Sequence, residues 1–418
     1  MSSFDENLKK YAELIVKVGL NLRAGQRLII NTGTTRGVPV HSAPLVREVT
    51  RAAYKAGARF VEVIWGDEEM LRIRAELAPR DSVEEYSTWH IEALKQMIGG
   101  GDALLSISSV DPDLLNGLDP DFIGGLQKEH LKQYSPVSAS VSRNAVNWCV
   151  VSGASPGWAK KIFPDLSVDD AQDKLWQAIF EATRVDQPDP IKAWEKHIAA
   201  LRTRANYLQA RQYTALKYTA PGTDLTIGLP RGHKWISAQS LAENGVVFTA
   251  NMPTEEVFTL PDRTRVDGTV QATFPLSYAG TLIEDFCLTF EKGRIVKASA
   301  KTGEAALKHL IETDEGAAYL GEVSLVPASS PIGTRGHLFY NTLYDENASC
   351  HIAIGRAYRF TLTGGEELTD EEFIQGGGNV SITHVDFMIG SNRMDVDGVK
   401  EDGSTEPVLR AGEWVIEA

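Results

Sequence analysis

Apolar and polar positions repeat with two different periods along this chain, and the period changes near its middle. Near the start, Leu8, Tyr11 and Leu14 recur at the spacing of one helix face, which predicts an amphipathic helix over residues 4–20. Strand-like apolar runs and helix-like segments then take turns: strands at 27–31, 59–65 and 102–107, and helices at 42–56 and 67–76. This alternation predicts a mainly parallel sheet covered by helices.

The pattern of the second half is different. Residues 169–205 have a helical pattern with a break at 187–190, and a period of two begins after about Tyr207. Further elements are predicted as strands at 213–218, 222–229 and 413–417, and a helix at 304–312. A chain of 418 residues is too long for one ordinary core. We therefore predict an N-terminal α/β domain over 1–206 and a C-terminal α+β domain over 207–418.

Composition and charge exclude several classes of protein. With 43% hydrophobic and 23% charged residues, the chain is typical of a soluble globular protein. Its net charge of −14 argues against nucleic acid, whose phosphates call for a basic surface. The longest apolar runs fall short of the ~18 residues of a membrane span, and the first residues lack the basic and apolar regions of a secretory signal. We expect a cytoplasmic protein without nucleic-acid or membrane partners.

The cysteines support the same view. Cys149, Cys287 and Cys350 are an odd, scattered set without a Cys-x-x-Cys motif. Such a set forms neither a disulfide framework nor a zinc knuckle.

Two familiar enzyme motifs are absent or broken. No Gly-x-Gly-x-x-Gly or Walker-type loop follows a predicted strand, so we predict no nucleotide site. Residues 153–157 match Gly-x-Ser-x-Gly, but the residue after the serine is Pro156, which has no N–H to donate to an oxyanion. Ser155 is better interpreted as the cap of a helix that begins at Pro156.

Residue types suited to metal binding gather toward the end of the chain. Residues 347–358 are predicted to form a helix, with acidic and polar residues at its amino end. His351 and Tyr358 are seven residues apart and would share one face of that helix.

A second part of the candidate centre follows. His384 and Asp386 are two residues apart in a predicted strand over 380–387, so both side chains would point to the same side. A helix face and a strand face would then present His351, Tyr358, His384 and Asp386 to one point. Imidazoles and a carboxylate are ligands that zinc and cobalt prefer.

Each of these residues also has a simpler interpretation when taken alone. His351 is then a core histidine, and His384 with Asp386 a buried hydrogen-bonded pair. The simpler interpretation weakens for the whole set, because burying several ionisable groups is costly unless they are paired or bind metal. The adjacent Glu255 and Glu256 would point to opposite faces of a strand, so only one of them would face a site.

Several of these segments resemble a known family. Residues 345–355 with Tyr358 behind them, and residues 383–391, resemble the signature of the thermophilic aminopeptidase family, of the aminopeptidase T, aminopeptidase S and PepS type. The resemblance covers nearly the whole chain and includes segments at 155–159, 176–184, 189–194, 251–259 and 313–327.

The resemblance implies a function and a set of site residues. It implies removal of amino-terminal residues from peptides, a homodimer, and dependence on zinc, cobalt or magnesium. Metal ligation is implied most firmly at five positions and less firmly at Glu346; the five are Glu256, Glu322, His351, His384 and Asp386. The C-terminal domain is thus the predicted catalytic, metal-binding domain.

The expected chemistry follows from the size of this ligand set. Six ligands are too many for one catalytic zinc but suit two divalent ions that share a bridging carboxylate and a water. No His-Glu-x-x-His occurs, which disfavours a single-zinc protease. Glu322 or Glu346 would act as the base, and Tyr358 would donate a hydrogen bond to the developing oxyanion.

Two alternatives stay open. The first is a two-metal hydrolase of another amide or of an ester, which activity on a free-amine peptide and its acetylated form would distinguish. The second is a non-enzymatic binding protein whose acidic cluster holds a structural ion.

Overall fold

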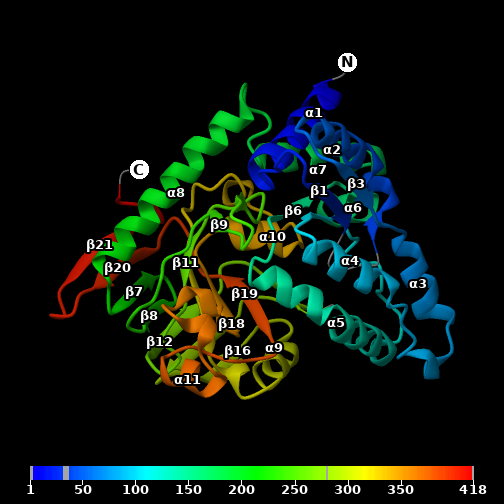
Figure 1. The fold of residues 1–418 in the computed structure, drawn as a ribbon. Coiled ribbons are helices and arrows are strands. Elements are labelled where there is room, and N and C mark those ends of the chain that lie inside the picture. Colours follow the sequence, from blue (N-terminus) through cyan, green and yellow to red (C-terminus); the bar gives the residue numbers. More distant parts are fainter. Residues whose placement is uncertain (1–2, 32–36, 279–280, 417–418) are drawn as a thin grey trace. The chain divides into compact units, whose positions relative to one another are not determined.

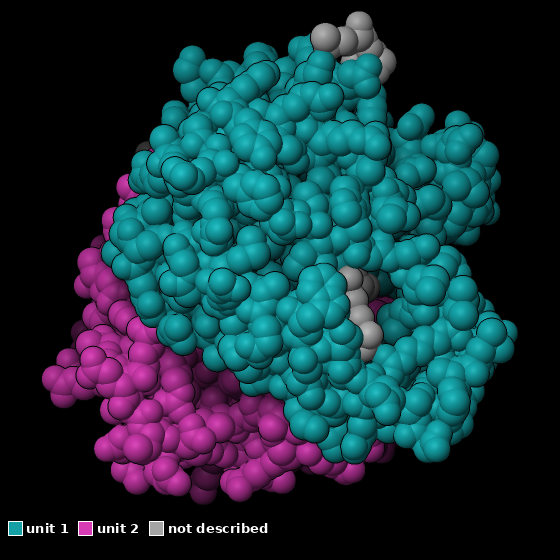
Figure 2. Space-filling model, turned by 45° about the vertical axis from the view of Figure 1, so that its right-hand side comes forward, with its two compact units in different colours: residues 1–196, 239–253 teal, residues 197–238, 254–418 magenta. Residues whose placement is uncertain are grey.

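The computed structural model describes residues 3–31, 37–278 and 281–416. The chain divides into two compact units, shown in teal and magenta in Figure 2, and each unit contains two stretches of the chain. Unit 1 contains residues 1–196 and 239–253, and unit 2 contains residues 197–238 and 254–418. No helix in the described ranges is both long and apolar enough to cross a membrane.

Unit 1 is built on a parallel sheet. Its strands are β1 Arg27–Asn31, β3 Phe60–Val63, β5 Ala103–Ser108 and β6 Trp148–Ser152, in the order β3-β1-β5-β6. Its helices are α1 Ser3–Leu14, α2 Ala43–Lys55, α3 Glu68–Leu77, α4 Trp89–Gly99, α5 Pro120–Ser142, α6 Pro156–Ile162 and α7 Val168–Ala182. Two short pairs complete it: β2 Val38–Pro39 with β4 Trp65–Gly66, and β9 Gln239–Leu241 with β10 Val247–Thr249.

Burial on both faces explains why the central strands β1 and β5 are mostly apolar, whereas the edge strand β3 is partly exposed and carries Glu62. Ile29 and Leu104 pack in one cluster with residues of α4 and α5, while α1, α2 and α7 lie on the other side of the sheet (Figure 1). The predicted parallel sheet covered by helices is confirmed. The predicted helix cap is also present, since the backbone N–H of Trp158 donates to Ser155 Oγ at 3.2 Å.

The two main sheets of unit 2 are antiparallel. The larger has the order β16-β15-β12-β8-β7-β20-β21-β22, with β7 Ala215–Ala220, β8 Thr223–Gly228, β12 Val266–Gln271, β15 Cys287–Glu291, β16 Arg294–Ser299, β20 Asp395–Val399, β21 Thr405–Arg410 and β22 Glu413–Trp414. The smaller has the order β11-β17-β18-β19, with β11 Val257–Thr259, β17 Leu320–Leu325, β18 His351–Gly355 and β19 His384–Met388. The fold is therefore mixed, with a parallel α/β part followed by an antiparallel part, as predicted.

The remaining elements are short, apart from one long helix. They include the antiparallel pair β13 Leu276–Tyr278 and β14 Thr281–Ile283, and the helices α9 Glu304–Ile311, α10 Thr342–Asp345 and α11 Asp370–Gln375. The long helix α8, Pro190–Arg211, begins in residues of unit 1 and continues in unit 2, because the units divide between Lys196 and His197.

The predicted helix over 347–358 is wrong. Helical structure ends with a 3₁₀ turn at Glu346–Ala348, and the next residues form strand β18, which pairs with β17 on one side and β19 on the other. Ile352 and Ile354 are β-branched and fully buried, which favours a strand between two neighbours. The histidine and tyrosine of this segment are therefore not held on one helix face.

Candidate metal centre

The candidate ligands lie on one face of the four-stranded sheet. Directly opposite residues in an antiparallel sheet project to the same side. Glu322 pairs with Ala353, and Ala353 pairs with Asp386 on the next strand. The same face carries three further pairs in register: Phe258 with Ser324, Ser324 with His351, and Gly355 with His384.

Two clusters of ligand-type atoms form on this face, and they share Glu322. In the first, His351 Nε2 lies 3.3 Å from Glu256 Oε2 and 3.5 Å from Glu322 Oε1. In the second, His384 Nε2 lies 3.7 Å from Glu322 Oε2 and 3.5 Å from Asp386 Oδ1. The two oxygens of Glu322 thus belong to different clusters.

These separations fit atoms around an ion better than atoms in direct contact. A charge-assisted hydrogen bond is about 2.7–2.9 Å long. Two ligand atoms on a tetrahedral zinc, each about 2.0–2.1 Å from it, are about 3.3 Å apart. Asp386 Oδ1 is also buried without a hydrogen-bond partner among the described residues. The donor set therefore fits divalent cations.

Backbone carbonyls orient both imidazoles. His351 Nδ1 donates to the carbonyl of Ser349 at 3.3 Å, and His384 Nδ1 donates to the carbonyl of Arg356 at 2.6 Å. With the proton of the neutral ring held on Nδ1, the lone pair of Nε2 points at the carboxylates. This is the usual arrangement of a histidine that binds metal.

Small residues leave space between the ligands. Ala353 stands between Glu322 and Asp386, and Gly355 stands opposite His384. Gly355 has a φ of 103°, and a Cβ there would lie 2.3 Å from the carbonyl oxygen of Thr383. A Cβ at Gly321 would lie 2.2 Å from the carbonyl oxygen of Arg356, the same atom that anchors His384. The backbone can therefore close around the centre only with glycine at these two positions.

The charges of the two clusters are strongly coupled. Burial raises the pKa of Glu322 to about 7, with further raising by Asp386 and Glu256. Burial alone would lower the pKa of His384, but Asp386 and Glu322 raise it to about 9. The pKa of His351 is likewise raised, because Glu256 and Glu322 outweigh its burial. Without a cation, the imidazolium groups neutralise the carboxylates.

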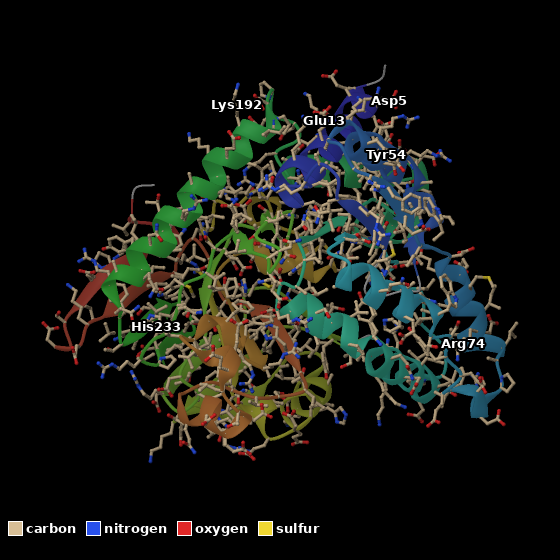
Figure 3. The ribbon with its side chains drawn as sticks, in the orientation of Figure 1. Asp5, Glu13, Tyr54, Arg74, Lys192 and His233 are labelled. Atoms are coloured by element: carbon tan, nitrogen blue, oxygen red, sulfur yellow. The ribbon has the colours of Figure 1, made fainter. Side chains whose placement is uncertain are left out.

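The direction of the pKa shift distinguishes His351 and His384 from a buried histidine with a structural role. His233, labelled in Figure 3, is also buried in unit 2, and its Nδ1 donates to the carbonyl of Pro230 at 2.9 Å. Its pKa is lowered, because burial outweighs that hydrogen bond. Burial and a hydrogen bond from Nδ1 therefore do not by themselves identify a histidine as a candidate ligand. The carboxylates around the ring distinguish a candidate ligand from a structural histidine.

The two adjacent glutamates point in different directions, as predicted, although they lie just before strand β11 and not within it. Glu256 reaches the ligand face, where Ser324 Oγ donates to its Oε2 at 2.8 Å. Glu255 Oε2 instead lies 3.6 Å from His197 Nε2. The backbone N–H of Glu255 donates to Asn347 Oδ1 at 2.7 Å, which ties this segment to the turn that carries Glu346.

Glu346 and Tyr358 lie beside the clusters. Burial raises the pKa of Glu346 well above its usual range, and the charges of Glu256 and Asp386 raise it further. The Tyr358 ring lies 4.9 Å from the His384 ring, and burial followed by the Glu322 charge raises the pKa of its phenol. Among the described residues, the two clusters of ligand atoms do not include Glu346. Both groups therefore lie within electrostatic reach of the ligand atoms.

The sequence did not indicate Ser324 or the supporting carbonyls of Ser349 and Arg356. Ser324 lies two residues after Glu322, so the period of two could have placed it on the same face. Backbone carbonyls leave no side-chain signal in a sequence.

Comparison with known proteins gives this geometry a context. Residues 4–414 match the family described as "Thermophilic metalloprotease (M29)". The chain belongs to this family. Its members are metal-dependent peptidases, and this chain is therefore a hydrolase that uses divalent metal, with a centre of carboxylates and histidines available for it. The resemblance seen in the sequence motifs is confirmed.

Individual relatives of this M29 chain are similar over their whole length. Aminopeptidase AmpS of Bacillus subtilis is 48% identical over 414 residues, which cover 99% of this chain and 100% of that protein. Aminopeptidase T of Thermus thermophilus is 44% identical over 416 residues, covering 100% of both. The solved structure described as wild-type AmpT from Thermus thermophilus matches with a TM-score of 0.93 and 44% identity, covering 99% of this chain and 100% of that one.

Proposed function

We propose that this chain removes amino-terminal residues from peptides with the help of two divalent ions, which the residues of the ligand face would hold, with Glu322 as a ligand of both. The names of its relatives support the aminopeptidase activity. The observation that carries the two-ion proposal is the position of the Glu322 carboxylate, whose Oε1 faces His351 and whose Oε2 faces His384.

The donor set indicates how the ions would be held. One site would use Glu256, Glu322 and His351, and the other would use Glu322, His384 and Asp386. Three protein ligands per ion leave positions open for water and substrate, as in other catalytic sites. Imidazole with carboxylate favours zinc or cobalt over magnesium, which prefers oxygen ligands alone. When bound, such a pair of ions supplies a Lewis acid for the scissile carbonyl and lowers the pKa of a water.

Glu346 is the residue we assign as the general base. It lies within electrostatic reach of Glu256, Asp386 and His351 but outside both clusters of ligand atoms. Glu322 has both oxygens directed at the clusters, so it has none left for proton transfer. Glu346 would take a proton from the attacking water and return it to the leaving amine.

Tyr358 is the residue we assign as the hydrogen-bond donor to the oxyanion. Its raised pKa keeps the phenol protonated at neutral pH, as a donor requires. The contact of its ring with His384 places it beside the second cluster.

The test is hydrolysis of a leucyl chromogenic amide by the purified chain before EDTA, after EDTA, and after return of zinc or cobalt. We expect activity to be lost with EDTA and restored by metal, and to be absent in His384→Ala. His309→Ala is the matched control, because His309 is exposed on α9 and should leave the activity intact. The acetylated leucyl amide should not be cleaved.

Two results would contradict the proposal. Equal cleavage of the acetylated and free-amine substrates would indicate another kind of amide hydrolase. A metal-loaded chain that cleaves neither substrate, and that loses thermal stability together with its metal, would indicate a structural ion.

A further inference from the structure

Three aromatic rings border the ligand face and connect its two ends. Phe258 on β11 lies on that face opposite Ser324. The Phe258 ring is 6.5 Å from the Tyr358 ring and 6.3 Å from the Phe360 ring, both edge to face. Phe360 stacks on Tyr358, with ring centroids 5.3 Å apart and an interplanar angle of 21°. Tyr358 in turn contacts the ring of His384.

These rings are half-buried. All three are partly exposed, whereas the other face of the same sheet is formed by buried residues such as Val323 and Ile352. An apolar surface beside a few converging polar groups is the usual composition of a small-molecule site. The polar side here is the ligand face, and the apolar side is the group Phe258, Tyr358 and Phe360, which we call the aromatic wall.

We propose that the aromatic wall is the subsite for the side chain of the substrate's amino-terminal residue and that it selects apolar side chains. This inference rests on the proposed aminopeptidase function and adds a substrate class to it. The scissile carbonyl belongs to the amino-terminal residue, and the hydroxyl that we assign to its oxygen is that of Tyr358. The side chain of that residue is attached to the α-carbon beside this carbonyl, which would bring it near the ring of Tyr358 and near Phe360 stacked on it.

Phe360 is the position at which to test this, because it adjoins no candidate ligand in the sequence. A series of chromogenic amides that differ only in their amino-terminal residue isolates this subsite, since the leaving group stays constant. We expect Phe360→Ala to lower the ratio of kcat/KM for the leucyl amide to that for the alanyl amide by about tenfold, the usual effect of losing apolar contacts in a pocket. Phe360→Leu should restore most of the ratio.

A charge at the same position should redirect the preference. Phe360→Glu is expected to raise the ratio of lysyl to leucyl amide hydrolysis by about tenfold or more, because a carboxylate would pair with the substrate ammonium. A structural role for Phe360 would not produce this change. Phe163→Ala is the matched control, since Phe163 is a partly exposed phenylalanine of unit 1, at the end of α6 and beneath Lys174.

The outcomes separate this inference from the proposed function. Metal content and melting temperature are measured on each variant, so that loss of fold is recognised. Ratios that stay unchanged in Phe360→Ala and Phe360→Glu, with the metal retained, overturn the subsite. Ratios that change only when the second residue of a dipeptide amide is varied also overturn it, because the wall would then bind the other side of the bond. A metal-loaded wild-type chain that cleaves no amide overturns both proposals.

Discussion

Ser324 and His351 lie directly opposite each other on β17 and β18, and both reach the same oxygen of Glu256. Ser324 Oγ donates to Oε2 at 2.8 Å, and His351 Nε2 lies 3.3 Å from it. The serine thus fixes the carboxylate in the orientation that the first cluster needs.

Removing this hydroxyl should weaken metal binding without unfolding the chain. We expect Ser324→Ala to lower metal affinity about 10- to 100-fold, as is usual when a group that orients a ligand is lost. Competition with a chromophoric chelator measures the affinity, and circular dichroism follows the fold. An unchanged affinity would show that Glu256 needs no such support.

The shared position of Glu322 predicts unequal effects of removing single ligands. Glu322→Gln should abolish binding of both ions, because both clusters use its carboxylate. Glu256→Gln and Asp386→Asn should each weaken one site and leave the other, so that metal analysis finds about one ion per chain. A Glu322→Gln chain that retains one tightly bound ion would contradict the bridging role.

Metal affinity should depend on pH in a definite direction. The pKa of His384 is about 9 and that of Glu322 is about 7, so at pH 7 the metal-free centre holds protons that an ion must displace. Affinity should therefore rise between pH 6 and pH 9, roughly tenfold per pH unit for each proton displaced. Calorimetry in buffers of different ionisation enthalpy measures this release, and binding without proton release would be inconsistent with these shifts.

The space beside Ala353 predicts a variant that keeps the fold but loses the metal. Ala353→Val would place a branched side chain between Glu322 and Asp386, and we expect both ions to be lost at a cost in stability of about 1–3 kcal/mol. The matched control is Ile352→Val on the opposite face, which should cost about 1 kcal/mol and keep the metal. Retention of both ions by Ala353→Val would show that the centre lies elsewhere on the face.

The spacing of apolar positions correctly predicted those helices and strands whose sequence follows a single repeat. Strands such as β1 and β5 are short, mostly apolar runs, and their parallel pairing follows from the helices between them. β18 was mistaken for a helix because a short apolar run fits both periods, and only pairing with β17 and β19 decides between them. No helix was predicted over 89–142, where α4 and α5 form; α5 has an interior proline at Pro136 and two glycines.

The candidate site was predictable to a similar extent. The spacing of His384 and Asp386 places both on one side of a strand, and the structure keeps them there. Sequence spacing alone could not predict that Glu256 lies beside His351, because that contact depends on the order of strands in the sheet. Glu256 was instead predicted as a ligand from the family motifs. Ser324 and the carbonyl of Arg356 were missed because their roles arise only from tertiary contacts.

The alternation of side chains along β19 also limits how the sequence of this centre can change in evolution. His384 and Asp386 occupy the same side of one strand, and the residues between and beyond them, Val385 and Phe387, occupy the other. A shift of one residue in the pairing of β19 with β18 would turn both ligands to the other face of the sheet at once and bring apolar side chains to the ligand face. Length variation among descendants of this chain should therefore be confined to the connections between the ligand-bearing strands, and the two ligands of β19 should be inherited or lost together.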